Sequence, residues 1–415
     1  MHKSSSNRFI GAFLGIIVEY YDFSLYVLAG PKIMHHFFPA SGDHQLHFWA
    51  IYAASYMAKP IGALLFGKIG DVYGRKIALN ITTIGIFVPT VLMGLLPSYA
   101  VIGIWSPIML TVCRYTQGVF IAGGYDSAAI YVIEHMGEKY KSTASASARC
   151  ACVVGLLFAL GSIHICMLPC FPTWGWRIPF LISFPLALVT LYYRKKIDET
   201  PDFQKAKKEQ AITYHLIDLL KQQWRTIGKI ICIAGGSSIT YQIIILFLPK
   251  FLPNVFPSIT DATISYHTAR VFICFAIGML LSGILADKLG YAIVLKISIW
   301  GSILTSLWLG IAIIQQMTHM ALIASLLLAG CIAPFTALIH GIIIQAFPVK
   351  ERNRGIALGH TIGSMLMASS AGYICTAMIK ANYTLFPLIY SNSAMLLAYY
   401  ITSRLRLYIE MRKRN

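Results

Sequence analysis

The feature that most constrains this chain is a series of long apolar runs joined by short connections. An α-helix needs about 20 mostly apolar residues to cross the hydrocarbon core of a bilayer, and twelve runs are close to that length or longer. They cover residues 9–34, 48–68, 77–96, 103–134, 144–168, 176–193, 227–252, 267–286, 291–313, 319–346, 355–379 and 383–403. The pattern predicts an all-α integral membrane protein with twelve transmembrane helices.

The composition agrees with a chain that is surrounded mainly by lipid. Of its 415 residues, 57% are hydrophobic and 12% are charged, whereas a soluble domain has about 25% charged residues. The sequence has no phosphate-binding glycine-rich loop and no helical histidine pair with a glutamate between them. We therefore expect no enzyme, and neither a cofactor nor a metal site.

Lysine and arginine are distributed unevenly between the two sides of the predicted spans. If both termini are cytoplasmic, most of the basic residues fall on that side. The outer side then keeps only Lys32, Arg177, Lys250 and Lys380. Such a bias is typical of cytoplasmic loops, and it accounts for the net charge of +18 without a nucleic-acid partner. We predict that both termini are cytoplasmic.

One long polar connection, residues 194–226, divides the spans into six and six. Each half contains a similar segment after its second span, GKIGDVYGRK at 67–76 and GILADKLGYA at 283–292. In both segments an aspartate follows the first glycine by four residues and precedes another glycine by three. Repeated six-helix halves are typical of transporters. The predicted domains are a bundle at 1–193, a cytoplasmic loop at 194–226 and a bundle with a tail at 227–415.

The segment at 67–76 is the strongest local motif. Gly67 and Gly74 permit close helix approach and a tight turn, and Asp71 can accept hydrogen bonds or pair with an arginine. Arg75 and Lys76 belong on the cytoplasmic side. The segment resembles the loop signature of the major facilitator superfamily, and RYTQG at 114–118 resembles its second signature. The resemblance implies a fold of two pseudo-symmetric six-helix bundles and a conformational latch at these five residues.

Charged residues inside the predicted spans are functional candidates because they are costly in lipid. Glu19 and Asp22 are three residues apart and therefore share one face of a helix. Arg114 lies within the fourth span. It can meet a substrate carboxylate, or it can form a structural ion pair with Glu19, Asp22 or Glu134. Both alternatives stay open from the sequence.

A narrower resemblance covers most of the chain. The stretches that carry it are EYYDF at 19–23, KPIGALLFGKIGDVYGRK at 59–76, WGWRIPFLISFPLAL at 174–188 and RKKIDETPDF at 194–203. They resemble the metabolite:proton symporter family, and most of all its proline/betaine carriers. The resemblance implies secondary active uptake of a small metabolite with protons by alternating access. It also implies a monomer in the inner membrane of a bacterium.

The chain also departs from this family pattern. Where relatives have Gly-Gly-Glu after the second signature, this chain has Ala122, Gly123 and Gly124, and a new acid, Asp126, follows. Arg149 stands in the fifth span where relatives carry a glutamine or an acid. We expect Asp126 with Arg149 to replace the missing glutamate, although drift in a divergent relative also explains the changes.

Five further residues are weaker candidates. Lys59, near the midpoint of the second span, either extends toward the interface or pairs there, or it contacts substrate. Tyr241 and Gln242 follow the small-residue stretch GGSSIT in the seventh span, and they either line the cavity or pack between helices. His340 and His360 are interpreted as hydrogen-bonded structural residues, with a proton relay as the alternative.

Together these features predict a proton-coupled transporter for a small zwitterionic or anionic metabolite such as proline or betaine. In this hypothesis Glu19 and Asp22 share ammonium recognition and proton binding, and Arg114 meets a carboxylate. Two alternatives remain: a proton-coupled symporter of organic acids, and a substrate sensor that keeps the fold without transport.

Overall fold

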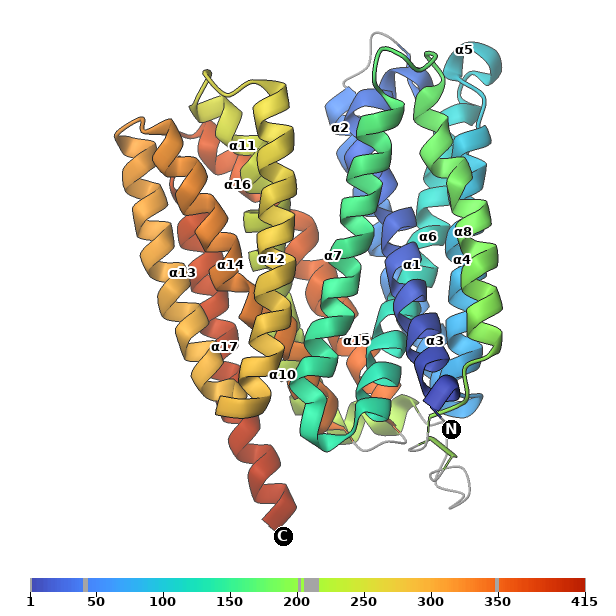
Figure 1. Cartoon of the computed structure of the whole chain (residues 1–415), viewed down its shortest axis with the longest axis vertical. Coiled ribbons are helices and arrows are strands. Elements are labelled where there is room, and N and C mark those ends of the chain that lie inside the picture. The colour runs from blue at the N-terminus through green and yellow to red at the C-terminus, as the bar shows by residue number, and fades with distance from the viewer. Residues whose placement is uncertain (1, 40–43, 201–202, 205–215, 348–350, 415) are drawn as a thin grey trace. The chain divides into compact units, whose positions relative to one another are not determined.

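The computed structural model describes residues 2–39, 44–200, 203–204, 216–347 and 351–414, and regular structure in these ranges is entirely helical. Figure 1 traces the chain from α1 in blue to α17 in red. The prediction of an all-α protein is confirmed. Residues 201–202 and 205–215 of the predicted central loop lie outside the described ranges.

The helices before the central connection follow the predicted spans closely. They are α1 (His2–Phe37), α2 (His44–Met57), α3 (Lys59–Val72), α4 (Arg75–Leu95), α5 (Tyr99–Ile102), α6 (Trp105–Met136), the short 3₁₀ turn η1 (Glu138–Tyr140), α7 (Lys141–Cys166), the 3₁₀ turn η2 (Gly175–Arg177) and α8 (Ile178–Lys195).

The helices after the central connection include two π-helical segments, η3 and η6. The elements are α10 (Leu216–Tyr241), η3 (Gln242–Phe247), α11 (Leu248–Val255), α12 (Asp261–Leu289), α13 (Tyr291–Ile314), α14 (Thr318–Ile343), the 3₁₀ turn η4 (Ile344–Ala346), α15 (Arg352–Gly363), η6 (Ser364–Ala368), α16 (Ser369–Lys380) and α17 (Phe386–Arg414).

Helix α4 illustrates how these helices suit a lipid environment. Its exposed stripe is apolar and recurs at helical spacing through Ile77, Ile81, Ile84, Val88 and Leu92. Its buried face instead contains the hydroxyls of Thr82, Thr83 and Thr90. A soluble helix shows the opposite arrangement, with apolar residues inside and polar residues outside. The polar groups of α4 therefore face the protein interior, where they can form a site.

Nine helices within the described ranges are long and apolar enough to cross a membrane. The other three predicted spans also appear as helix. The span at 48–68 is divided between α2 and α3, the span at 103–134 is α6, and the span at 383–403 lies in α17. A proline follows the first residue of α3, and proline disrupts a continuing helix because it lacks an N–H donor.

The described residues pack into two compact units. Unit 1 comprises residues 1–135, 151–214 and 349–358, and unit 2 comprises 136–150, 215–348 and 359–415. Two helices contribute to both units: the first part of α7 belongs to unit 2, and the first part of α15 belongs to unit 1. The predicted domain boundaries at 193 and 226 stay a prediction.

Candidate functional site

The acidic residues of α1 lie deep inside unit 1. Glu19 and Asp22 are each 1% exposed, and α1 packs against both α4 and α8. Their three-residue spacing places both on one side of the helix, as expected. The two carboxyls nevertheless have different surroundings, and this difference separates their chemical roles.

Glu19 forms a buried ion pair with Arg194. Its Oε1 atom lies 2.9 Å from Nη1 of Arg194 and accepts hydrogen bonds from the hydroxyls of Thr82 at 3.2 Å and Thr83 at 3.4 Å. Arg194 also donates to the Thr83 hydroxyl and to the Leu79 carbonyl. A buried charge requires such compensation because transfer out of water is costly.

Sequence reasoning missed Arg194. The sequence places Arg194 at the start of the predicted cytoplasmic loop, because it directly follows the apolar run that ends at residue 193. In the structure its side chain is fully buried in the last turn of α8. The position of Arg194 beside the end of an apolar run was the only sequence feature that could have indicated burial. A surface-exposed cation is found at the same kind of position.

Two glycines make room for this ion pair. A Cβ atom added to Gly15 would lie 2.0 Å from Nη2 of Arg194, and one added to Gly124 would lie 2.4 Å from Oε2 of Glu19. Both distances are well inside van der Waals contact. Gly124 occupies the position where the family pattern has a glutamate, so the missing acid would have faced Glu19.

Asp22 has no such cation. Its polar neighbours in unit 1 are the hydroxyl of Ser183 on α8 and the carboxylate of Glu19. Its Oδ1 atom has no hydrogen-bond partner among the described residues. A buried carboxyl without a compensating cation can bind a proton, because its charged form is poorly solvated.

Of the two alternatives for Arg114, the structural ion pair with Glu19, Asp22 or Glu134 is not found among the described residues. Arg114 is fully buried and donates to the carbonyl of Phe23 at 3.2 Å, to Oε1 of Gln117 at 2.6 Å and to the hydroxyl of Ser55 at 3.3 Å. Glu19 pairs instead with Arg194. Arg114 is thus a buried cation that neutral groups surround.

Aromatic rings complete the surroundings of Arg114. Its guanidinium carbon lies 4.6 Å from the ring centre of Phe23 and 4.4 Å from that of Tyr26. The ammonium of Lys59, a half-buried residue at the start of α3, lies 3.6 Å from the ring centre of Tyr56 and 5.5 Å from that of Phe23. Two cations therefore share the ring of Phe23.

The remaining candidates from the second half lie in unit 2. Tyr241 ends α10 and Gln242 begins the π-helical segment η3, a type of distortion that is frequent at functional sites. The guanidinium of Arg149 lies 5.6 Å from the ring centre of Tyr241. Asp126 is buried in unit 1, so its predicted cooperation with Arg149 stays a prediction.

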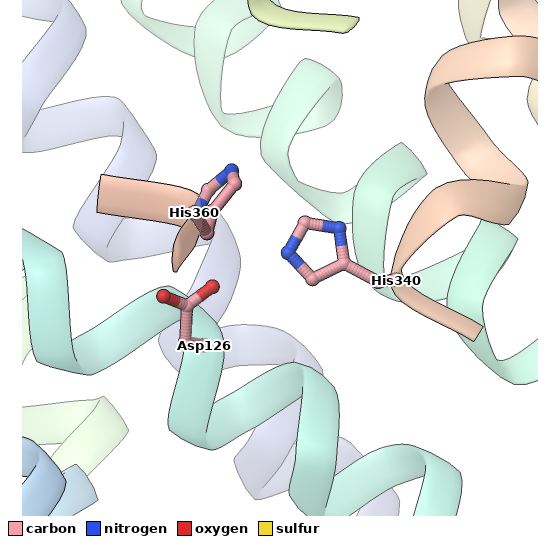
Figure 2. A group of neighbouring side chains, drawn as sticks. All are labelled: Asp126, His340 and His360. Atoms are coloured by element: carbon pink, nitrogen blue, oxygen red, sulfur yellow. The ribbon is translucent and has the colours of Figure 1, made fainter. Parts of the chain in front are cut away.

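The two membrane histidines contact each other. The ring centres of His340 and His360 are 4.7 Å apart in an edge-to-face arrangement, which Figure 2 shows. Both residues belong to unit 2, whereas Asp126 in the same figure belongs to unit 1. Sequence reasoning treated the histidines singly because 19 other residues separate them in the chain.

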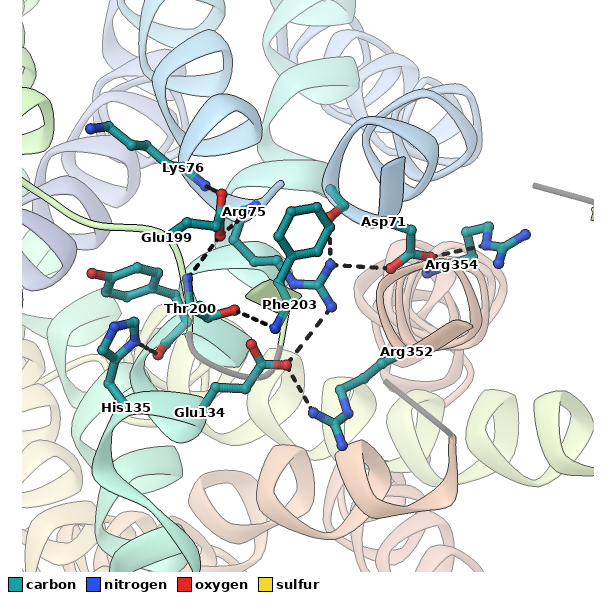
Figure 3. Close-up of polar contacts among 12 residues, drawn as sticks. Asp71, Arg75, Lys76, Glu134, His135, Glu199, Thr200, Phe203, Arg352 and Arg354 are labelled. Carbon is teal, nitrogen blue, oxygen red and sulfur yellow. Dashed lines mark hydrogen bonds and ion pairs between the residues drawn. The ribbon is translucent and has the colours of Figure 1, made fainter. Parts of the chain in front are cut away.

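The motif at 67–76 forms a charged network in unit 1 (Figure 3). Oδ2 of Asp71 accepts hydrogen bonds from the backbone N–H of Arg354 at 3.2 Å and from its Nε at 2.9 Å. A Cβ atom added to Gly67 would lie 3.2 Å from Cα of Arg354, so this glycine permits the approach. Burial raises the pKa of Asp71 to about 6 although Arg75 and Arg354 oppose the rise, and Asp71 therefore remains ionised at neutral pH.

A second acid extends the network. Oε1 of Glu134 lies 2.8 Å from Nη1 of Arg352 and 3.8 Å from Nη2 of Arg75, and Arg75 lies 3.5 Å from Asp71. Glu134 is twenty residues beyond Arg114 on α6, or about 30 Å at 1.5 Å per residue. This distance explains why Glu134 cannot be the partner of Arg114.

Glu199, from the ETP stretch of the family resemblance, caps the first turn of α4. Its two carboxylate oxygens accept hydrogen bonds from the backbone N–H groups of Arg75 at 3.0 Å and Lys76 at 3.1 Å. Gly74 precedes them with φ of 114°, a conformation that favours glycine. The ring of Phe203 lies 5.2 Å from the Arg75 guanidinium. The start of the central loop therefore fixes the 67–76 motif.

The repeat in the second half makes a related contact within unit 2. The two carboxylate oxygens of Asp287 accept hydrogen bonds from the backbone N–H groups of Ser142 and Thr143, each at 2.9 Å. These groups lie in the first turn of α7, just as Arg354 lies in the first turn of α15. A carboxylate at a helix N-terminus satisfies free N–H groups and suits the helix dipole.

Comparisons with known proteins agree with the helical architecture. The model of the family described as sugar (and other) transporter matches residues 8–222, just over half of the chain. The model of the major facilitator superfamily matches residues 257–406. The first match ends within the central connection and the second begins after it.

Two curated relatives illustrate the similarity in sequence. The proline/betaine transporter of Salmonella typhimurium is 27% identical over 413 residues, which cover 94% of this chain and 79% of the relative. The inner membrane metabolite transport protein YhjE of Escherichia coli is 28% identical over 397 residues, with 92% and 90% covered.

Among solved structures, the proton:xylose symporter XylE superimposes with a TM-score of 0.80 at 16% sequence identity, covering 97% of this chain and 96% of that one. At this identity the likeness establishes the fold alone. The predicted major facilitator fold is confirmed.

Proposed function

The chain belongs to the sugar (and other) transporter family of the major facilitator superfamily, and from this premise we propose that it takes up a small zwitterionic metabolite, such as proline or a betaine, together with protons. That it is a multi-pass membrane transporter of a small molecule, and not an enzyme, follows from its family and fold. The proposal further specifies the class of substrate and the coupling of uptake to protons. It also places the protein in a bacterial inner membrane as a monomer with cytoplasmic termini. Relatives named as proline/betaine transporters support the substrate class.

The observation that carries proton coupling is the contrast between the two acids of α1. Asp22 is buried without a cation among the described residues, whereas Glu19 is held in an ion pair with Arg194. We assign proton binding to Asp22. Glu19 is already compensated by Arg194, so Asp22 is the acid of α1 whose negative charge is not balanced by a cation among the described residues.

The substrate carboxylate has two candidate partners in unit 1. Arg114 is a buried cation whose hydrogen bonds all go to neutral groups. Lys59 is half-buried and lies on the same ring, that of Phe23. In unit 2, Arg149, Tyr241 and Gln242 are further candidate substrate contacts, at the point where the π-helical segment begins.

The latch role rests on Asp71 and Asp287. Each holds the first turn of a helix that belongs by sequence to the other half of the chain, α15 in one case and α7 in the other. Alternating access requires such contacts to form in one conformation and break in another. The other residues of the 67–76 motif support the contact of Asp71. Gly67 permits the close approach of Arg354, and Gly74 forms the turn. Glu199 caps the helix through the backbone N–H groups of Arg75 and Lys76.

Uptake by the purified protein in proteoliposomes tests the function. With an inward proton gradient, radiolabelled glycine betaine or proline is expected to accumulate above its external concentration, and a protonophore is expected to abolish accumulation. Equal uptake with and without the gradient would exclude proton coupling. Accumulation of citrate or 2-oxoglutarate instead of the zwitterions would favour an organic-acid symporter, and binding without flux would favour a sensor.

A further inference from the structure

Two cations of the protein lie near the ring of Phe23, and each also lies near the ring of a neighbouring tyrosine. Arg114 lies against Phe23 and Tyr26, and Lys59 lies against Tyr56 and Phe23. All five residues belong to unit 1. Several aromatic faces are thus oriented toward positive charge inside a membrane protein.

An aromatic face attracts a cation through the electron density of its ring, and this attraction is stronger where water is excluded. Quaternary ammonium groups benefit most because they cannot donate hydrogen bonds, so rings are their natural partners. Tyr56 and Lys59 are only half-buried, which leaves this end of the cluster accessible. Arg114, at the other end, is fully buried.

We propose that Tyr56 and Phe23 form the recognition site for the quaternary ammonium group of a betaine-type zwitterion, an inference that rests on the proposed function and specifies its substrate class. The carboxylate of the ligand pairs with the ammonium of Lys59 and draws it from the ring of Tyr56. The trimethylammonium group of the same ligand then occupies the ring face that Lys59 has left. One cation replaces another on the ring.

This exchange favours zwitterions over simple anions. An anion that pairs with Lys59 removes the cation from Tyr56 and supplies none in return, whereas a zwitterion restores the contact. The carboxyls of α1 are not required for ammonium binding in this scheme. Glu19 remains with Arg194, and Asp22 remains available for the proton.

The test compares glycine betaine with tert-butylacetate, which has the same shape and carboxylate but a neutral carbon in place of the nitrogen. Both compete against radiolabelled glycine betaine for the purified protein in detergent. The wild-type protein is expected to bind glycine betaine about 3- to 30-fold more tightly than tert-butylacetate, the range that a cation–ring contact provides. Equal affinities would overturn the proposal.

Substitution of the ring identifies the site. Tyr56→Leu is expected to remove the preference for glycine betaine and to leave tert-butylacetate binding within about twofold. Tyr56→Phe keeps the ring while losing the hydroxyl that Tyr52 contacts at 3.0 Å, and it should keep the preference. Tyr115→Leu, at a 40% exposed tyrosine on α6, is the matched control. An unchanged preference in Tyr56→Leu, or an equal loss for both ligands, would overturn the assignment.

The thermal stability of Tyr56→Leu without ligand shows whether this variant is folded. If it is not, the two ligands are compared on Phe23→Leu, for which we expect the same loss of preference for glycine betaine. The outcome is independent of proton coupling. Preferential binding of glycine betaine together with protonophore-resistant uptake would reject the proposed proton symport and leave this inference intact.

Discussion

Glu19 and Arg194 form an ion pair in the interior of unit 1, with Oε1 and Nη1 2.9 Å apart and both side chains 1% exposed. The pair joins the middle of α1 to the last turn of α8, 175 residues further along the chain. It provides one acid of α1 with a counter-charge, whereas the other acid, Asp22, is the residue to which we assign proton binding.

Breaking this ion pair should be strongly destabilising. Glu19→Gln leaves Arg194 buried without its counter-charge, and we expect a loss of about 3–5 kcal/mol in the free energy of unfolding. Arg194→Met leaves Glu19 uncompensated and should have a similar effect. Unfolding of the purified protein in mild detergent measures both.

The double variant provides the control for this prediction. With both charges removed, the loss should be clearly smaller than the sum of the two single losses, because no unpaired charge remains. Additive losses would show that the two residues act independently.

Small residues beside the ion pair should tolerate no added methyl group. Gly124→Ala places Cβ against Glu19 and Gly15→Ala places it against Arg194, and we expect each to lower the free energy of unfolding by about 1–3 kcal/mol. Gly161→Ala is the matched control, since no atom lies within 4 Å of its added Cβ. It should stabilise its helix by about 0.5–1 kcal/mol. Similar effects at all three positions would contradict the packing described around the ion pair.

Asp22→Asn should separate transport from proton coupling. The amide cannot exchange a proton, so uphill accumulation of glycine betaine should disappear, while exchange of internal for external glycine betaine should continue. Both are measured in proteoliposomes, with Asp22→Glu as the conservative variant that should retain accumulation. Accumulation by Asp22→Asn at the wild-type level would remove Asp22 from the mechanism.

Asp71→Asn should alter the transport cycle without altering the ligand site. The ion pair with Arg354 is lost, and a weakening of about 1.4 kcal/mol shifts a conformational equilibrium about tenfold. The initial rate of uptake should fall, whereas the affinity for glycine betaine measured in detergent should change far less.

A double variant tests whether Asp71 acts through its ion pair with Arg354. Asp71→Asn combined with Arg354→Gln should be no slower than the slower single variant, because both substitutions remove one contact. A multiplicative loss would show that Asp71 acts through another partner, such as Arg75.

Glu199→Ala should loosen the start of α4. The backbone N–H groups of Arg75 and Lys76 lose their acceptors, and loss of a helix cap costs about 0.5–2 kcal/mol. Hydrogen exchange should rise at the first turn of α4 and stay unchanged at the first turn of α7, where Asp287 provides the cap. Equal exchange in wild type and variant at α4 would argue against the capping role.

The sequence by itself determined the all-helical membrane architecture and the family. Spans depend on runs of apolar residues, which are local properties of the chain, because lipid requires each backbone polar group to be satisfied within its own helix. The motif at 67–76 could also be identified from the sequence, because its glycines and its aspartate have a characteristic spacing. Even the placement of Glu19 and Asp22 on one face follows from helical periodicity alone.

Only the tertiary structure decided which charges meet. Arg194 resembled a loop cation and proved to be the partner of Glu19, and Arg114 resembled the partner of an acid and proved to lie among neutral groups and rings. These pairings depend on the rotation and packing of helices that are more than ninety residues apart in the chain. Hydrophobicity places a helix in the membrane but does not fix its rotation. Its rotation depends on packing against other helices, because steric exclusion acts between helices and not along one of them.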